Sequence, residues 1–304
     1  MRPADRPGGA DDGFHGFLVV DKPAGWTSHD VVARARRLLD ERRIGHAGTL
    51  DPAATGVLPL AVGSATKVVE YLAEASKTYL AEITFGVRTD SHDGDGLVVS
   101  VADASNLCQA DVESALASLR GAIEQVPPMH AAIKIGGRRL YELARRGEEV
   151  ERPSRSVTLF QLELVDWRPA TVTLWVDCSK GTYVRALARD IGEALDVGAY
   201  LSNLVRVRTG PFSLCQAVTL EELERASVWW EWPELAVHPD AVLADWPAVV
   251  LDEPATIDWR HGNSLVGGTP DAGPFRAYGP DGTWLGLGRA DAAVWRPTKV
   301  VGGA

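Results

Sequence analysis

The order of hydrophobic and polar residues along the chain predicts strands and helices that follow one another without a regular β-α-β repeat. Apolar runs and alternating apolar residues are typical of strands, and they occur over residues 16–20, 57–62, 79–85, 157–165 and 172–178. Apolar residues at helical spacing predict helices over residues 28–43, 65–75, 109–119 and 182–195. This irregular interleaving favours an α+β fold on a mixed sheet over a doubly wound parallel sheet.

Short polar residues and glycines predict where two of these helices begin and end. Ser28 is expected to cap the first helix, and Gly45 is expected to end it. Thr182 is expected to cap the last helix, in which Arg185 and Arg189 stand four residues apart. These two arginines therefore lie on one polar face of that helix.

The composition divides the chain into three parts. Residues 1–13 are rich in Pro, Gly and Asp, which predicts a disordered tail rather than a signal peptide or membrane anchor. Residues 14–245 are expected to form a large domain with a long insertion over about 126–154, and so long a connection is usually a functional loop. In residues 246–304, short strands alternate with Gly, Pro and Asp turns, which predicts a small all-β module.

Four tryptophans near the start of this module allow two interpretations. They are Trp229, Trp230, Trp232 and Trp246. Such rings can serve as stacking platforms for nucleic-acid bases. Buried aromatic side chains are more often used for packing, so we expect these four in the core and between the domains.

Overall charge and local charge favour different partners. The 304 residues include 31 basic and 41 acidic side chains, and the formal charge of -10 argues against a nucleic-acid partner. The arginines are nevertheless clustered, and arginine suits bidentate phosphate contacts. The clusters comprise Arg34, Arg36, Arg37, Arg42 and Arg43, then Arg138, Arg139, Arg145, Arg146, Arg152 and Arg155, and finally Arg185, Arg189, Arg206 and Arg208. One pair alone is typical of a solvated helix face, whereas three clusters in an acidic protein favour a phosphate-rich partner.

Several common kinds of site are not expected. The three cysteines are far apart, which predicts neither a disulfide framework nor a metal site and fits a reducing cytoplasm. The seven histidines lack metal-ligand spacing. Residues Ser91–Gly96 resemble the start of a calcium loop, but Ala102 occupies the position of its bidentate glutamate. No apolar run reaches the ~20 residues of a membrane span, so no membrane partner is expected.

The segment from Gly45 to Gly56 has the most distinctive pattern in the chain. It presents one carboxylate, Asp51, in a turn bracketed by glycines, which let a ligand or the backbone approach closely. Pro52 keeps Asp51 out of the helical region and holds it on a stiff corner. Such a corner can expose a nucleophilic or acid–base carboxylate, although an Asp-Pro pair is also a common turn.

Five segments in a fixed order identify a family. They are Gly16–Pro23, Gly45–Gly56, Lys77–Tyr79, Lys180–Arg185 and Arg208–Phe212. Over residues 14–304 the chain resembles bacterial tRNA pseudouridine-55 synthases of the TruB family. The resemblance implies an isomerase that converts one uridine of the tRNA TΨC loop, at position 55, to pseudouridine without a cofactor or metal. It also implies an α+β fold with a mixed, mainly antiparallel sheet flanked by helices and loops, and a small C-terminal β-barrel-like module of PUA type.

The resemblance assigns roles to three catalytic residues. Asp51 matches the catalytic aspartate, which acts as the nucleophile on a flipped-out uridine and must be ionised at neutral pH. Arg185 is expected to form an ion pair with Asp51 and to lower the pKa of its carboxyl group. Tyr79 is expected to stack on the uracil and to assist proton transfer at C5, although it also shares a strand face with core residues.

Further residues are expected at the RNA. Tyr183 and Leu204 match the lining of the uracil pocket, His46 matches the residue that fills the space of the flipped base, and Lys22 is a further expected substrate contact. The insertion over 126–154 matches a loop that clamps the RNA hairpin. Its expected backbone contacts are Arg138, Arg139, Arg145 and Arg146.

The chain departs from the family pattern at one position, and three other functions are still to be considered. Val205 stands where an arginine is usual in the family, so the sequence does not decide whether phosphate is contacted at that place. The chain could be a guide-RNA-dependent relative from a box H/ACA particle, a tRNA-folding chaperone or an aspartate glycoside hydrolase. The compact C-terminal module favours a stand-alone enzyme that needs no guide RNA, and the charged helix faces favour a monomer. A glycoside hydrolase needs a second positioned carboxylate, and no motif supplies one.

Overall fold

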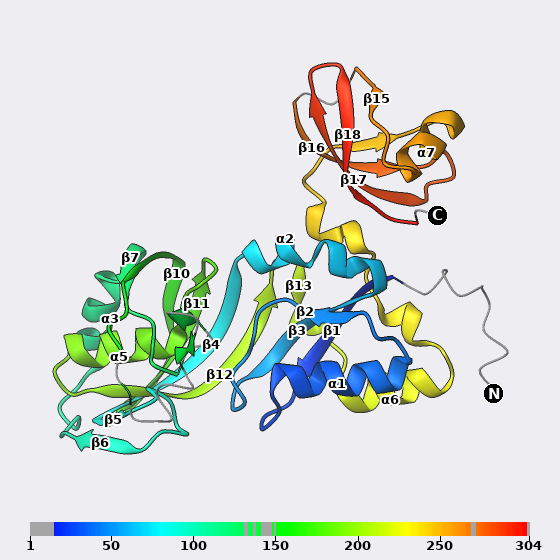
Figure 1. Cartoon of the computed structure of the whole chain (residues 1–304). Coiled ribbons are helices and arrows are strands. Elements are labelled where there is room, and N and C mark those ends of the chain that lie inside the picture. The colour runs from blue at the N-terminus through cyan, green and yellow to red at the C-terminus, as the bar shows by residue number, and fades with distance from the viewer. Residues whose placement is uncertain are drawn as a thin grey trace.

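We analysed a computed structural model of the chain, in which residues 15–130, 133–135, 138–140, 148, 150–268 and 272–302 are described. The expected tail over residues 1–13 lies outside this part of the chain, as do Arg145 and Arg146 of the insertion. The described residues form a large domain on one long sheet and a smaller C-terminal module beside it (Figure 1).

The large domain is built on a nine-stranded sheet whose strand order differs from the chain order. The main path runs through β1 (Gly16–Lys22), β3 (Thr55–Val62), β12 (Ala199–Thr209), β4 (Lys77–Phe85), β11 (Thr171–Cys178), β10 (Arg155–Arg168) and β7 (Gly121–Gln125). Strand β12 is parallel to β3, whereas it is antiparallel to β4, and the remaining pairs along this path are antiparallel. This arrangement confirms the predicted mixed, mainly antiparallel sheet.

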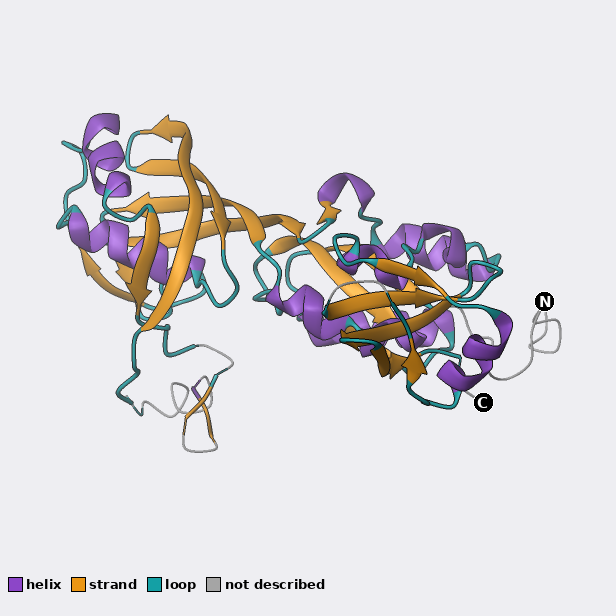
Figure 2. Cartoon of the chain, turned by 90° about the horizontal axis from the view of Figure 1, so that it is seen from above, coloured by secondary structure: helices purple, strands orange, loops and turns teal. Residues whose placement is uncertain are grey.

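Helices cover the two halves of the sheet separately. Helices α1 (Ser28–Leu39) and α6 (Leu220–Val228) pack together near β1, while α3 (Gln109–Ala117) and α5 (Val184–Ala194) pack near β10 and β12 (Figure 1). Each pair buries its apolar stripe in a hydrophobic cluster of its own. Seen from above, the strands continue from one half to the other (Figure 2). The site described below lies where strands from both halves meet.

The start of α1 differs from the prediction because Ser28 has another partner. Thr27 is the N-cap: its hydroxyl accepts a hydrogen bond from Asp30 N–H at 3.1 Å, and the Asp30 carboxylate accepts one from Thr27 N–H at 2.9 Å. Ser28 Oγ instead accepts from the N–H of Leu50 at 2.9 Å. The predicted cap therefore supports the loop that carries Asp51.

Two predicted helices also have different boundaries. Helix α1 ends at Leu39, and Gly45 lies in the short strand β2 (Ile44–His46), which pairs with β3. The helix predicted over 65–75 is divided into a 3-10 turn, η2 (Gly63–Lys67), and helix α2 (Val69–Glu74).

The start of α5 differs from the prediction as well. Its N-cap is Tyr183, which makes no side-chain capping bond, and the Thr182 hydroxyl donates to the carbonyl of Ser179 at 3.0 Å. Thr182 therefore closes the turn before the helix instead of capping it.

Several short elements connect the main ones. They are the hairpin of β5 (Val87–Thr89) and β6 (Val98–Val101), the hairpin of β8 (Lys134–Ile135) and β9 (Arg138–Arg139) in the insertion, β13 (Phe212–Ser213), and the 3-10 turns η3 (Leu214–Gln216), η4 (Trp232–Leu235) and η5 (Pro239–Leu243). None of the described helices is both long and apolar enough to cross a membrane.

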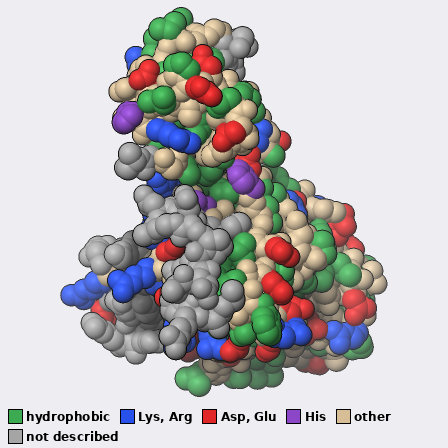
Figure 3. All heavy atoms as spheres, turned by 90° about the vertical axis from the view of Figure 1, so that its right-hand side faces the viewer, with side chains coloured by type: hydrophobic (Ala, Val, Ile, Leu, Met, Phe, Trp, Pro, Cys, Tyr) green, Lys and Arg blue, Asp and Glu red, His purple; other side chains and the backbone are tan. Residues whose placement is uncertain are grey.

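The C-terminal module is a five-stranded sheet with one helix. In spatial order its strands are β14 (Ala248–Val250), β16 (Gly273–Tyr278), β17 (Trp284–Asp291), β18 (Val294–Val300) and β15 (Leu265–Val266), and the helix is α7 (Glu253–Arg260). Trp259 and Phe275 are buried in its core. Acidic and basic side chains are interspersed over the face of the molecule seen in Figure 3.

The module rests on the large domain through a shared core. Trp284 and Leu287 of the module belong to the same buried cluster as Phe17 and Leu72. Lys299 Nζ lies 2.9 Å from the carboxylate of Glu70 on α2. A shared apolar core of this kind fixes the position of the module relative to the large domain.

The four tryptophans near the module do not behave alike. Trp232 is buried, and Trp246 packs edge-on against Tyr71 with ring centroids 5.0 Å apart, as predicted for packing residues. Trp229 and Trp230 are exposed, so the prediction of core packing was wrong for these two. They lie at the end of α6, where the helix leaves the core.

Candidate active site

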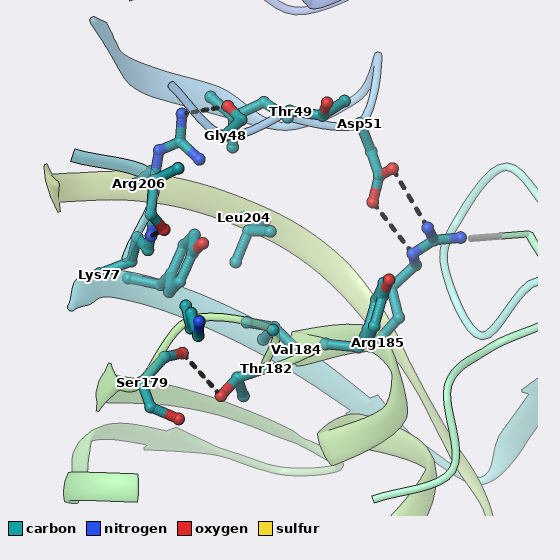
Figure 4. A pocket seen from close by; sticks show the side chains of 16 residues that line it. Gly48, Thr49, Asp51, Lys77, Ser179, Thr182, Val184, Arg185, Leu204 and Arg206 are labelled. Atoms are coloured by element: carbon teal, nitrogen blue, oxygen red, sulfur yellow. Dashed lines mark hydrogen bonds and ion pairs between the residues drawn. The ribbon is translucent and has the colours of Figure 1, made fainter. Parts of the chain in front are cut away.

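A cavity of about 300 Å³ opens between the two halves of the large domain. Its walls come from residues 48–51, from Ala73, from Lys77 and Tyr79 on β4, from residues 179–185, and from Leu204 and Arg206 on β12 (Figure 4). Cavities of this size are typical of sites for small ligands or single groups of a larger one. The topology creates it, because β12 lies between β3 and β4.

Asp51 and Arg185 form a two-point ion pair at one end of this cavity. Arg185 Nε lies 3.0 Å from Asp51 Oδ2, and Arg185 Nη2 donates to Asp51 Oδ1 at 3.1 Å (Figure 4). The arginine side chain is 7% exposed, whereas that of Asp51 is 42% exposed. The guanidinium therefore fixes both oxygens of a carboxylate that remains open to a ligand.

Burial raises the pKa of the Asp51 carboxyl group above its ordinary value, and Arg185 acts in the opposite direction. A smaller upward contribution comes from Asp93. From the sequence we predicted only the lowering by Arg185. The net direction is upward because taking a carboxylate out of water disfavours its charged form more than this arginine favours it.

Lys22 anchors the loop of Asp51 from behind. It is 0% exposed, and its ammonium donates to the carbonyls of Pro23 at 2.9 Å, Trp26 at 2.7 Å and Pro52 at 3.0 Å. Burial lowers the pKa of Lys22 to about 8. Since three carbonyls occupy the ammonium, Lys22 is placed to hold the corner at Pro52.

Arg206 holds the same loop at both of its ends. It is 1% exposed; its Nε donates to the carbonyl of Val57 at 2.8 Å, and its Nη2 donates to that of Gly48 at 3.0 Å. Gly56 must lack a side chain here, because its φ is +99° and a Cβ would lie 2.2 Å from the carbonyl oxygen of Arg206. Arg206 was predicted to belong to a cluster suited to phosphate, but it is buried and bonded to two backbone carbonyls instead.

The three expected uracil-contacting residues meet in the cavity. Tyr79 and Leu204 are largely buried on neighbouring strands, and Tyr183 is half-buried at the start of α5. Burial raises the pKa of both tyrosine hydroxyls, so each is protonated at neutral pH. A flat ring entering this cavity would meet aromatic and aliphatic walls.

His46 lies outside the lining of this cavity. Its half-buried ring packs edge-on against His29, with centroids 5.5 Å apart. Burial lowers the pKa of His46 below its ordinary value, which keeps the ring neutral at physiological pH. Val205 is also outside, because it lines a separate cavity of about 290 Å³. The departure at Val205 therefore does not alter the walls around Asp51.

Asp93 is a site residue that the sequence analysis missed. Its Oδ2 lies 3.2 Å from Nη1 of Arg185, so one guanidinium contacts two carboxylates. The residue lies between β5 and β6, in the segment considered above as a calcium loop, and it accepts from Asp95 N–H at 3.2 Å. An acidic, Gly-rich turn was the only available signal. No sequence motif supplied a second positioned carboxylate, and the fold brings that of Asp93 to the guanidinium that also holds Asp51.

The basic residues of the insertion are only partly described. Arg138 is exposed on β9, and Arg139 follows it on the same strand. Outside the insertion, Arg208 pairs with Asp177 at 3.0 Å. RNA contacts by the insertion therefore remain a prediction.

Comparisons with known sequences find relatives over most of the chain. Profiles described as the N-terminal domain of the TruB family pseudouridylate synthase, the C-terminal domain of tRNA pseudouridylate synthase B, and the C-terminal domain of pseudouridine synthase II TruB match residues 36–184, 185–244 and 247–301. A tRNA pseudouridine synthase B of Symbiobacterium thermophilum is 53% identical over 250 residues, which cover 81% of this chain and 82% of that protein. The protein of that name from Trichormus variabilis is 40% identical over 294 residues, covering 94% and 98%.

Solved structures share the fold. A chain in a crystal structure of a Cbf5-Nop10-Gar1 complex is 27% identical and superposes with a TM-score of 0.72, covering 96% of this chain and 82% of that chain. A chain in an H/ACA RNP bound to a substrate RNA containing 2'-deoxyuridine is 25% identical, with a TM-score of 0.73 over 98% of this chain and 88% of that chain. The chain therefore belongs to the TruB family of pseudouridylate synthases and is an enzyme that isomerises uridine in tRNA.

Proposed function

We propose that this enzyme acts on the uridine at position 55 in the TΨC loop of tRNA, that it works without a guide RNA, and that Asp51 is its nucleophile. The observation that carries the proposal is the two-point contact between Arg185 and a partly exposed Asp51 at the end of a cavity. A carboxylate held in this way is oriented and kept available to an incoming ribose.

The reaction breaks the N1–C1′ bond of the uridine and forms a C5–C1′ bond. In the proposed scheme the uracil leaves with the bonding electron pair, rotates, and attacks C1′ through C5. The proton on C5 is then lost and N1 gains one, so the product is an isomer of the substrate. As the nucleophile, the Asp51 carboxylate captures C1′ or adds to C6. The alternative route, elimination to a glycal, would use the same carboxylate as a base, and all three routes need it ionised.

The cavity walls support a role for the tyrosines and Leu204 in holding the detached uracil. Tyr79 is placed to stack on the ring, and Tyr183 and Leu204 are placed to confine it while it rotates. Uridine stacked inside an RNA loop cannot reach Asp51, so the base must be flipped out at a cost of a few kcal/mol. His46 is proposed to offset part of that cost by entering the vacated space.

RNA binding is assigned to the insertion and the C-terminal module. Arg138, Arg139, Arg145 and Arg146 are proposed to contact phosphates, which contributes affinity without reading sequence. The module resembles a PUA domain and is proposed to contact the tRNA outside the TΨC loop. Its shared core with the large domain supports a fixed spacing between these contacts and Asp51.

The test is pseudouridine formation on an unmodified tRNA transcript, with no other RNA or protein present. Wild-type enzyme should convert position 55 and leave a transcript with cytidine at 55 unmodified. Asp51→Asn should bind the transcript with an affinity within about threefold of wild type and convert none of it, a loss of ~10⁴-fold or more in kcat.

The same experiment separates the alternatives. Conversion only after a guide RNA is added would assign the chain to the guide-dependent relatives. Equal stimulation of tRNA folding by wild type and Asp51→Asn, without conversion by either, would identify a chaperone.

A further inference from the structure

Gln125 is a buried polar residue with an unusual set of partners. It is the last residue of β7, where the insertion leaves the sheet, and it is 1% exposed. Its Oε1 accepts a hydrogen bond from the N–H of Tyr183 at 2.7 Å, and its Nε2 donates to the carbonyl of Tyr183 at 3.1 Å. One side-chain amide thus satisfies both backbone groups of a single residue, as a neighbouring strand would do.

Tyr183 is the residue from which α5 starts. Its carbonyl also accepts the first helical hydrogen bond, from Leu187 N–H at 3.0 Å, and its own side chain makes no capping bond. The backbone groups at a helix start need partners, and Gln125 supplies one from a distant strand. Arg185 stands two residues later in the first turn of α5, and both Tyr183 and Arg185 line the cavity.

Two further contacts join the start of the insertion to α5. Arg189 Nη2 donates to the carbonyl of Val126 at 3.3 Å, and Arg185 Nη2 donates to that of His130 at 3.2 Å. The backbone after Gln125 therefore follows the helix that carries the arginine paired with Asp51. Gln125 is the first and the most buried of these contacts.

We propose that Gln125 is a positioning residue for catalysis: its amide seats the Tyr183–Arg185 turn of α5, so that Arg185 meets both oxygens of Asp51 and Tyr183 closes the uracil pocket. The role rests on the proposed function of the site. Displacement of a catalytic group by 1 Å is enough to lower a rate ~10²-fold. Loss of the two hydrogen bonds between Gln125 and Tyr183 therefore slows the chemical step.

Two substitutions and a control test the proposal. Gln125→Met keeps the volume but removes both hydrogen bonds. Gln125→Glu keeps them only when protonated, since a neutral carboxyl accepts from Tyr183 N–H through C=O and donates O–H to the Tyr183 carbonyl, whereas a carboxylate has no proton for that carbonyl. Gln109→Glu places the same change on the exposed start of α3.

Gln125→Met should lower kcat on the transcript about 10- to 100-fold while KM changes less than about threefold. For Gln125→Glu, the kcat relative to wild type should rise by up to ~tenfold per unit as the pH is lowered through the titration of Glu. Burial favours the neutral form of that carboxyl, and Arg155, opposite residue 125 on β10, favours the charged form. For Gln109→Glu, the kcat relative to wild type should stay close to one at every pH.

A ratio for Gln125→Glu that does not change between pH 5.5 and 9, or a Gln125→Met enzyme whose loss only follows its unfolded fraction, would overturn the proposal. Hydrogen exchange at the Tyr183 amide provides a readout that needs no activity, and Gln125→Met should accelerate it. If wild-type enzyme fails to convert the transcript, the proposed function is refuted, and the exchange rate still decides whether Gln125 seats Tyr183.

Discussion

The two ends of the cavity hold their charges in different ways (Figure 4). At one end, Arg185 is paired with the carboxylates of Asp51 and Asp93. At the other end, Arg206 donates to the carbonyls described above, and Lys77 Nζ donates to those of Ala73 and Ala75, each at 2.6 Å.

Within one site, the charged groups at one end are available for the reaction, and those at the other end hold the structure in place. Ion pairs can exchange partners with a charged substrate, and Asp51 stays partly exposed for that purpose. Backbone carbonyl groups cannot exchange partners in this way. Arg206 therefore fixes the shape of the loop that carries Asp51, and Lys77 fixes the backbone at Ala73 and Ala75. Lys77 is 6% exposed, and this burial lowers the pKa of its ammonium group to about 8.

Changing the guanidinium at the reactive end should have the largest effect. Arg185→Lys keeps a positive charge but replaces a planar two-point contact with a single ammonium. We expect kcat to fall about 10²- to 10³-fold with little change in tRNA affinity, measured by single-turnover conversion and by binding. Arg168→Lys, an exposed arginine on β10, is the matched control and should match wild type. Near-normal turnover by Arg185→Lys would contradict the assigned role.

Removing the second carboxylate should shift the pH profile as well as the rate. Because Asp93 raises the pKa of Asp51, Asp93→Asn should move the acid limb of kcat/KM to lower pH. The same change should lower kcat ~10- to 100-fold, since Arg185 loses one of the groups that orient it. Asp95→Asn removes a weaker contribution and should give a smaller shift in the same direction. An unchanged acid limb in Asp93→Asn would show that Asp51 does not set it.

At the end of the cavity held by Arg206, a substitution should mainly lower the stability of the protein and only then its rate. Arg206→Met removes two charged hydrogen bonds to backbone carbonyls and should lower the free energy of unfolding by about 2–4 kcal/mol. A less well fixed loop should also lower kcat ~10-fold in the fraction that remains folded. Denaturant unfolding and active-site titration separate the two effects. Arg168→Met should leave both quantities unchanged. Equal losses in the two variants would contradict the conclusion that Arg206 holds the Asp51 loop.

The smallest effect is expected outside the cavity, at the insertion. Arg138→Gln should weaken tRNA binding severalfold and reduce the slope of log Kd against log salt by about one, with kcat unchanged. Binding at several salt concentrations measures this slope. A slope equal to that of wild type would exclude a phosphate contact at Arg138.

Local pattern accounts for much of the fold and for part of the site. Strands over 16–20 and 172–178 were predicted from their apolar residues, because the hydrophobic pattern of a strand is contained in a few consecutive residues. The cap at Ser28 failed because its hydroxyl bonds to Leu50, far along the chain, and leaves Thr27 to close the helix. Competition of this kind is invisible to any short window of sequence.

The sequence by itself determined the α+β class, the family and the corner that presents Asp51. The class follows from the order of strand and helix patterns along the chain, and the family and the corner follow from short local motifs. Only the tertiary structure decided which side chains surround that corner. Asp93, Gln125 and Arg206 reach the site from separate strands and loops, and their roles follow from an ion pair and hydrogen bonds to residues far away in the chain. A polar side chain acquires its function from the partner it meets when buried, and strand pairing between distant segments chooses that partner.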